Sequence, residues 1–171
     1  MTPEEILQNE PRILNQTQRE NYFNFGYVSV EGLISKEWIK AIQSASKERI
    51  EASRIEINSG DEFDLGPEHS ADKPHVRRIK RPVDHHPVFK KFAVDSGLPD
   101  IAADLVGPNV KFHSCKINYK HPGNGEIVDW HQDICFWPHT NYSPVTLGFY
   151  LEGCNEAQGP LSVVSGSHKR P

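Results

Sequence analysis

The chain has 171 residues, of which 36% are hydrophobic and 25% are charged, so it can bury one core and is sized for a single domain. Its formal net charge of −4 and its pI near 6.1 argue against a basic surface that binds nucleic acid or an anionic membrane. There is no run of 18 apolar residues and no positively charged leader followed by an apolar stretch. We therefore expect no membrane span and no secretion, and we predict a cytoplasmic protein.

The cysteines are odd in number and carry no C-x-x-C spacing, which is typical of reduced thiols and not of a disulfide framework or a zinc knuckle. They are Cys115, Cys135 and Cys154. We expect them to behave as small buried apolar residues.

The first part of the chain has the pattern of helices with defined ends. The run Thr17-Gln18-Arg19-Glu20 has the form of a capping box and predicts a helix that ends at Gly26. A strand is expected over 27–30. Ser35 is expected to cap a second helix, whose apolar residues recur at helical spacing and so face the core. Pro99 suits the start of another helix, which Gly107 ends.

The middle of the chain is predicted to contain a loop, a basic strand and a turn. Residues 53–73 are polar and lack an apolar period, so we expect a long loop there. Residues 76–81 form a basic strand, which suits either an edge strand protected by charge or an anion-binding segment. The run His85-His86-Pro87 predicts a turn that enters a helix and not a metal-binding pair.

From residue 108 onward the pattern predicts strands, over 110–120, 126–133, 145–151 and 159–164. In the first of these, Lys116 and Asn118 share one face. That face is either exposed to solvent or turned inward, where a bound dicarboxylate would satisfy the ammonium and the amide.

The run Trp130-His131-Gln132-Asp133 holds the pair of side chains with the clearest chemistry. Residues separated by one position on an extended segment project to the same face. A neutral imidazole beside a carboxylate supplies two ligands of the facial triad that binds Fe(II) in non-haem oxygenases. The alternative is an ordinary surface pair of His131 and Asp133.

The residues after this pair resemble the phytanoyl-CoA dioxygenase family of Fe(II)/2-oxoglutarate-dependent oxygenases. The resemblance covers 17–169 loosely and 107–169 well, and it depends on the His-x-Asp pair, the hydrophobic strand over 145–151, an acidic turn with glycine over 155–161 and the closing Gly166-Ser167-His168-Lys169. It implies a mainly β fold with N-terminal helices (α+β). The helical part would cover 1–107, and 108–171 would form an incomplete double-stranded β-helix (jelly-roll, cupin-like) core.

The resemblance also implies a reaction and its participants. A small organic substrate is hydroxylated with release of succinate and CO2, using Fe(II), 2-oxoglutarate and O2, with ascorbate as a stimulant. Relatives that halogenate replace the carboxylate ligand with a small residue, so Asp133 implies hydroxylation. The implied residues are His131 and Asp133 as catalytic metal ligands, and Lys116, Asn118, Arg78 and Trp137 as contacts of the co-substrate.

One departure separates this chain from the family pattern. In the family, a second histidine ligand and an arginine about ten residues beyond it follow the Gly-Ser-His-Lys segment, and this chain stops at Pro171. His168 belongs to the closing turn itself and is not expected to replace the missing ligand. We therefore expect a fragment of a longer enzyme. Two alternatives stay open, a non-catalytic binding or structural module and a cupin-like metalloprotein that does not use 2-oxoglutarate. The substrate and the oligomeric state are not predicted.

Overall fold

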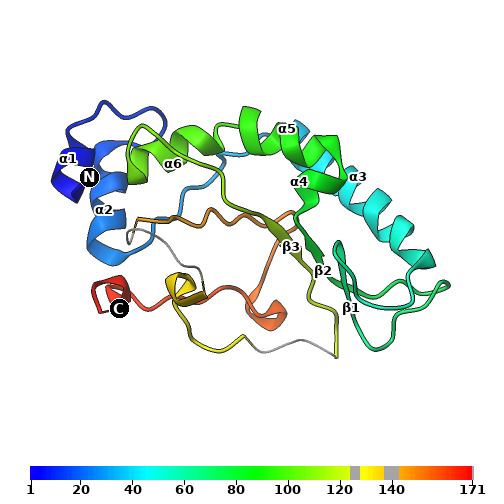
Figure 1. Ribbon diagram of the computed structural model, residues 1–171. Coiled ribbons are helices and arrows are strands. Elements are labelled where there is room, and N and C mark those ends of the chain that lie inside the picture. Colours follow the sequence, from blue (N-terminus) through cyan, green and yellow to red (C-terminus); the bar gives the residue numbers. More distant parts are fainter. Residues whose placement is uncertain (124–127, 137–142, 171) are drawn as a thin grey trace. The chain divides into compact units, whose positions relative to one another are not determined.

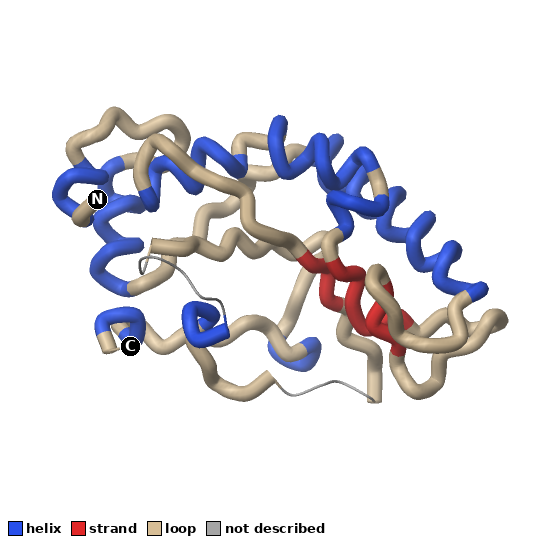
Figure 2. The backbone as a smooth tube through the Cα atoms, viewed as in Figure 1, coloured by secondary structure: helices blue, strands red, loops and turns tan. Residues whose placement is uncertain are grey.

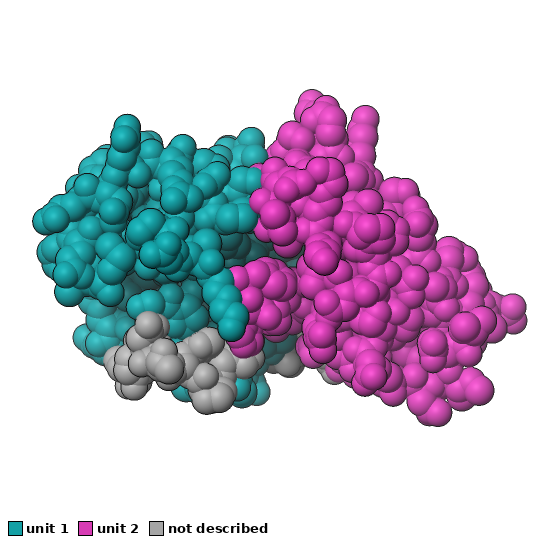
Figure 3. Space-filling view, turned by 45° about the horizontal axis from the view of Figure 1, so that its top comes forward, with its two compact units in different colours: residues 1–33, 97–111, 128–171 teal, residues 34–96, 112–127 magenta. Residues whose placement is uncertain are grey.

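The computed structural model of the chain describes residues 1–123, 128–136 and 143–170 (Figure 1). These residues form two compact units, coloured separately in Figure 3. Unit 1 comprises Met1–Leu33, Gly97–Lys111 and Val128–Pro171, and unit 2 comprises Ile34–Ser96 and Phe112–Ile127. In the part of the chain that is described, no helix is both long and apolar enough to cross a membrane.

Among its described residues, unit 1 contains three α-helices and three short 3-10 turns. The helices are α1 (Pro3–Leu7), α2 (Gln16–Phe25) and α6 (Leu98–Val106), and the turns are η2 (Asp133–Phe136), η3 (Glu156–Gln158) and η4 (Ser167–Lys169). Figure 1 shows α1 and α2 beside α6, which both of them contact. Much of the unit is therefore irregular backbone held against a small helical cluster.

The ends of α2 show which cap the helix uses. The side chain of Asn15 accepts a hydrogen bond from the backbone N–H of Gln18, whose side chain returns one to Asn15. The predicted cap at Thr17 is therefore wrong by two residues, because this reciprocal pair lies one half-turn earlier. The predicted end is confirmed, since Gly26 adopts a left-handed conformation with φ of 85°.

The N-terminal arm of unit 1 is fixed by a buried carboxylate. Asp104, which is only 3% exposed, accepts hydrogen bonds from the backbone N–H groups of Arg12, Ile13 and Leu14 at 2.8, 2.9 and 2.8 Å. The buried guanidinium of Arg19 donates to the backbone carbonyl of Asp104 at 3.0 Å. The arm before α2 is thereby tied to α6 by charge-assisted hydrogen bonds.

The apolar core of unit 1 is built on the same two segments. Leu14 packs with Ile101 and Leu105 of α6 in a buried cluster. Val145 and Leu147, which alternate along the chain, pack against this cluster from the C-terminal part of the unit. The core thus positions residues far along the sequence from α6.

Unit 2 packs helices against a three-stranded antiparallel sheet (Figure 2). Its elements are α3 (Lys36–Ala52), η1 (Ser53–Ile55), β1 (Phe63–Leu65), β2 (Val76–Lys80), α4 (Pro82–His85), α5 (Pro87–Asp95) and β3 (Lys116–Asn118). The predicted cap at Ser35 is confirmed, because its side chain accepts from the backbone N–H of Trp38. The predicted turn into a helix is also confirmed, because the His86 side chain accepts from the N–H of Val88 at the start of α5.

The register of the sheet separates an apolar row from a polar row. Phe63, Ile79 and Ile117 lie opposite one another across the three strands and form the core, against which Ile50 of α3 packs. The adjacent row joins Asp64, Arg78 and Asn118 on the other face, because side chains alternate along each strand. The sheet therefore buries one row and presents polar side chains on the other.

The sheet corrects the predictions made for the middle of the chain. The basic segment is β2, and it pairs on both sides, with β1 and with β3, so it is not an edge strand of this sheet. The region expected to be a continuous loop over 53–73 contains η1 and β1. The apolar period there was too short to see, because β1 has three residues and a register irregularity after Asp64.

The predicted strands of the C-terminal part are largely not formed among the described residues. Of 110–120, only β3 is a strand, and none is assigned over 27–30, 145–151, 159–164 or the described residues 128–133. A strand exists only where a neighbour supplies hydrogen bonds, and β3 has β2 as that neighbour. The alternating pattern at 145–147 persists as alternating contact with the core of unit 1.

A group of histidines closes the end of the sheet of unit 2. His75 is 6% exposed, and its ring meets the ring of His121 edge to face, with 4.1 Å between centroids. Its backbone N–H donates to Nδ1 of His69 at 2.9 Å, and Nε2 of His121 donates to the carbonyl of Val76 at 2.9 Å. A side chain at Gly66 would collide with the His75 ring, so this packing requires glycine there.

The Asp104→Ala substitution should lower the free energy of unfolding by roughly 3 kcal/mol, because three backbone N–H groups, one of them in a buried hydrogen bond and two in part-buried ones, lose a charged acceptor. Urea unfolding followed by circular dichroism measures this change. Asp100→Ala is the matched control on the same helix: its carboxylate pairs with Arg12 but is 46% exposed, so it should cost less than about 1 kcal/mol. Equal losses in the two variants would contradict the role given to Asp104.

Lowering the pH below about 7 should destabilise unit 2. Burial, followed by the facing ring of His121, lowers the pKa of His75 from its ordinary value of 6.5; Lys73 and His69 act in the same direction, while Glu68 opposes them. At acidic pH, His75 therefore binds a proton more readily in the unfolded chain than in the folded chain. The contribution of His75 to the free energy of unfolding is complete above pH 6.5 and decreases as the pH falls below that value. Urea unfolding at pH 7.5 and 5.5 should show this loss in the wild type and a smaller one in His75→Phe. An unchanged loss in the variant would exclude His75 as its source.

Candidate functional site

The predicted ligand pair comes together in unit 1. Nε2 of His131 lies 3.2 Å from Oδ1 of Asp133, and the two side chains are 39% and 37% exposed. The backbone differs from the predicted strand, because the described residues around His131 are irregular and Asp133 begins η2. The two groups nevertheless converge as the sequence spacing predicted.

The orientation of the His131 ring is set by a backbone carbonyl. Nδ1 of His131 hydrogen-bonds to the carbonyl oxygen of Asp129 at 2.8 Å. A carbonyl can only accept, so Nδ1 carries the proton, and in a neutral ring Nε2 presents its lone pair. That lone pair faces the carboxylate of Asp133, an arrangement that is repulsive unless a proton or a metal cation lies between the two groups.

The Asp133 carboxylate is oriented by a hydroxyl group. Oγ1 of Thr146 donates to Oδ2 of Asp133 at 3.0 Å, which leaves Oδ1 directed at His131. Thr146 lies between Val145 and Leu147, which pack into the core of unit 1, so alternation turns Thr146 away from that core. Such outer hydrogen bonds to ligand side chains are typical of metal sites.

The two donor atoms fit neighbouring positions on one metal ion. Donors bound at roughly 2.1 Å to adjacent octahedral positions lie about 3.0 Å apart, close to the observed separation of 3.2 Å. Among residues 1–123, 128–136 and 143–170, no group of three or more His, Cys, Asp or Glu side chains could hold a metal. Within these ranges, His131 and Asp133 are therefore two candidate ligands without a third beside them.

His168 does not supply a third ligand in this structure. Its Nε2 donates to the backbone carbonyl of Phe23 at 3.0 Å, at the end of α2, and its ring lies against Gly26. The expectation that His168 belongs to a turn is confirmed, since it lies in η4.

The predicted co-substrate residues of unit 2 share the polar face of the sheet. Arg78 lies directly opposite Asn118, and its Nε donates to Oδ1 of Asn118 at 3.0 Å. Nη1 of Arg78 lies 3.9 Å from Oδ2 of Asp64. Lys116 lies two positions from Asn118, and both are exposed, so of the two orientations considered the structure has the solvent-facing one. Trp137, also predicted as a co-substrate contact, lies outside the described residues.

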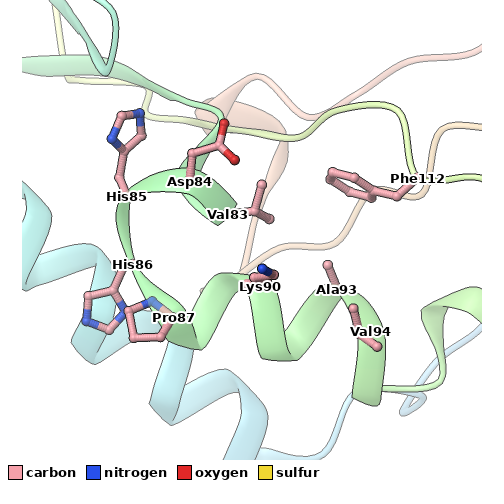
Figure 4. A pocket seen from close by; sticks show the side chains of 9 residues that line it. All are labelled: Val83, Asp84, His85, His86, Pro87, Lys90, Ala93, Val94 and Phe112. Atoms are coloured by element: carbon pink, nitrogen blue, oxygen red, sulfur yellow. The ribbon is translucent and has the colours of Figure 1, made fainter.

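The adjacent histidines line an open cavity of about 610 Å³ in unit 2 without pointing into it. Figure 4 shows Val83 and Phe112 projecting toward one another across this space, while the rings of His85 and His86 turn to the other side. Those rings face acids, with Nδ1 of His85 3.5 Å from Glu62 and Nε2 of His86 3.2 Å from Glu48. The two histidines therefore lie at the predicted turn and contact acidic side chains of neighbouring segments.

The cysteines and two site residues show what the sequence did not reveal. Cys115 is half-buried but Cys135 and Cys154 are exposed, so the expectation that all three are buried is wrong.

The roles of Thr146 and of the Asp129 carbonyl were not predicted from the sequence, since the Thr146 contact spans 13 residues and the Asp129 contact involves a backbone carbonyl. The alternation around Thr146 was the available pattern, because it turns this side chain away from the core.

Comparison with known proteins gives one matching family model and several relatives. The model described as Phytanoyl-CoA dioxygenase (PhyH) matches residues 22–171. A probable alpha-ketoglutarate-dependent hypophosphite dioxygenase of Stutzerimonas stutzeri is 31% identical over 153 residues, which are 89% of this chain and 53% of that protein. An ectoine dioxygenase of Sphingopyxis alaskensis is 26% identical over 151 residues, covering 84% of this chain and 46% of the relative.

A solved structure supports the same relationship at the level of fold. The crystal structure of EctD from S. alaskensis with bound Fe matches with a TM-score of 0.64 at 24% identity, covering 80% of this chain and 47% of EctD. The chain thus spans about half the length of the curated relatives it matches.

Replacing Thr146 with valine should weaken the binding of a divalent metal by about tenfold, because the Asp133 carboxylate loses the hydroxyl that orients it. Titration with Co(II), which accepts the same nitrogen and oxygen donors as Fe(II), measures the dissociation constant. Thr146→Ser keeps the hydroxyl and should stay within about threefold of the wild type. Equal affinities for the valine and serine variants would show that the hydroxyl does not orient the ligand.

Proposed function

Because the chain belongs to the phytanoyl-CoA dioxygenase family, we propose that it forms part of an Fe(II)- and 2-oxoglutarate-dependent dioxygenase that hydroxylates a small molecule with release of succinate and CO2. The observation that carries the proposal is the convergence of His131 Nε2 and Asp133 Oδ1 at 3.2 Å, with each side chain held from behind by a further hydrogen bond. We propose that the two units belong to one oxygenase domain with a double-stranded β-helix core.

His131 and Asp133 would hold the iron, which when bound supplies the oxidising chemistry together with O2 and the 2-oxo acid. The work of the chain itself is positioning. The Asp129 carbonyl keeps the proton on Nδ1 of His131 and so leaves Nε2 as the donor atom. Thr146 occupies Oδ2 of Asp133 and so leaves Oδ1 as the second donor atom. A site with these two ligands retains a carboxylate where a halogenating relative would have none, which supports hydroxylation.

The polar face of the sheet in unit 2 would contribute to binding 2-oxoglutarate. Asn118 accepts from Arg78 through Oδ1, so its amide N–H groups are directed to other acceptors. Lys116 adds an exposed ammonium on the same face. Two cationic groups and an amide donor suit an anion with carboxylates. Trp137 is proposed as a contact of the co-substrate on the resemblance to the family alone.

The substrate is proposed only as a small molecule. The relatives are named for hypophosphite and for ectoine, an oxyanion and a small organic compound, so membership of the family does not select between such classes. Ascorbate is expected to stimulate the reaction by keeping iron reduced, and the protein is proposed to act in the cytoplasm.

A non-catalytic module is the second candidate, and one observation favours it. Within the described ranges, no third His, Cys, Asp or Glu side chain joins the pair. A descendant that kept the fold and lost the reaction would show the same deficit. The two candidates differ in whether the pair still binds iron and whether 2-oxoglutarate changes that binding.

Anaerobic addition of Fe(II) and 2-oxoglutarate to the folded chain should produce the weak visible chelate band of this enzyme family. His131→Ala and Asp133→Ala should each reduce the band at least about tenfold, because each removes one of two protein ligands. His113→Ala, which removes an exposed histidine of unit 2, is the control and should leave the band unchanged.

The outcomes separate the candidate functions. Iron binding that 2-oxoglutarate does not alter would favour a metalloprotein without this co-substrate. Absence of iron binding by a chain shown to be folded, and by the same chain extended to the length of its relatives, would favour the non-catalytic module.

A further inference from the structure

The closing turn, defined as residues 166–170, has no role in the proposed chemistry, yet it contacts two separate parts of unit 1. It contains η4 and the Gly-Ser-His-Lys sequence. We propose that the closing turn is a positioning clasp that ties the ligand segment 131–133 to the C-terminal end of α2. This inference rests on the proposed function for its purpose, but its contacts do not depend on that function.

The first side of the clasp is held by Gln132, the residue between the two ligands. Its Nε2 donates to the backbone carbonyl of Ser167 at 3.0 Å and to that of Arg170 at 3.3 Å. An amide NH2 has two hydrogens, so one side chain can satisfy both carbonyls. Because both acceptors are backbone groups, the contact requires glutamine at 132 and the local shape of the turn, and not particular side chains at 167 and 170.

The second side of the clasp caps α2. The last carbonyls of a helix have no partner within the helix. Nε2 of His168 donates to the carbonyl of Phe23 at 3.0 Å, and the backbone N–H of Gly166 donates to the carbonyl of Phe25 at 2.8 Å. A side chain on Gly26 would collide with the His168 ring, so glycine is required there by contact as well as by its φ of 85°.

The clasp acts on a segment, residues 128–136, that forms no strand pairing among the described residues. Two side chains of this segment, Gln132 and Asp133, hydrogen-bond to other parts of unit 1. The Asp133 bond to Thr146 fixes one ligand side chain. The Gln132 bonds fix the backbone between both ligands, which is what keeps the two donor atoms at a constant separation.

A purely structural cap on α2 is the competing explanation, and it makes a different prediction. Such a cap would change stability without changing the geometry or metal affinity at 131–133. The clasp predicts that loss of the hydrogen bonds on either side also changes the order and the metal affinity of the ligand segment 131–133.

The first test removes the Gln132 side of the clasp. Gln132→Met keeps the length of the side chain and removes both donors, while Lys169→Met places the same residue in the same turn at an exposed position. We expect the Co(II) dissociation constant to rise about tenfold in Gln132→Met and to stay within twofold in Lys169→Met. Backbone ¹⁵N order parameters at 130–133, measured without metal, should fall only in Gln132→Met.

The second test approaches from α2. His168→Leu should lower the same order parameters and weaken Co(II) binding severalfold, although His168 touches neither ligand. His168→Gln retains a donor at the end of its side chain and should recover most of both effects. Gly26→Ala should resemble His168→Leu, because the added methyl group displaces the ring.

The clasp is overturned if Gln132→Met and His168→Leu lower the melting temperature while the order parameters at 130–133 and the Co(II) affinity stay at wild-type values. If the wild-type chain of 171 residues binds no Co(II), the order parameters alone decide. Lower order parameters at 130–133 in His168→Leu would then still support the clasp, and unchanged order parameters would contradict it.

Discussion

The buried carboxylate of Asp104 is the constraint on which unit 1 depends. By accepting three successive backbone N–H groups it fixes the chain before α2 and places Leu14 in the core. That core receives Leu147, and the alternation of the backbone then turns Thr146 toward Asp133. A helix-to-loop contact spanning about ninety residues of sequence is thereby connected, by packing and then by one hydroxyl, to the oxygen atom proposed to bind iron. Because Asp104 is buried, losing any of these hydrogen bonds is costly.

At the ligand pair, electrostatics and geometry favour the same occupant. Nδ1 of His131 is committed to a carbonyl and Oδ2 of Asp133 to a hydroxyl, so the remaining lone pairs face each other at 3.2 Å. Two facing electron pairs require a positive charge between them. A proton would satisfy that requirement as an ordinary ion pair, and a divalent metal would satisfy it with two bonds. The family to which the chain belongs makes the metal the better hypothesis, and the pair explains how this half of a relative's length could keep its part of the site.

Unit 2 shows how a short sheet separates apolar from polar side chains. One row of side chains across the strands is apolar and buried, and the adjacent row carries Arg78 and Asn118 in a cross-strand hydrogen bond. Because the register fixes both rows at once, a shift of β3 by one residue would expose Ile117 and break the polar pair together. The buried His75, next to the first residue of β2, packs edge to face against His121 in the same unit.

The sequence by itself determined the family, the ends of the helices at Gly26 and Ser35, and the convergence of His131 with Asp133, because each depends on residues close together in the chain. It did not determine which extended segments become strands, since a strand requires a partner that local pattern does not specify. Tertiary structure alone decided that β2 lies between two strands, that Thr146 orients Asp133 and that the closing turn reaches both α2 and Gln132. Those contacts join residues 11 to 145 positions apart, and only the packing of the folded chain brings such residues within hydrogen-bonding distance.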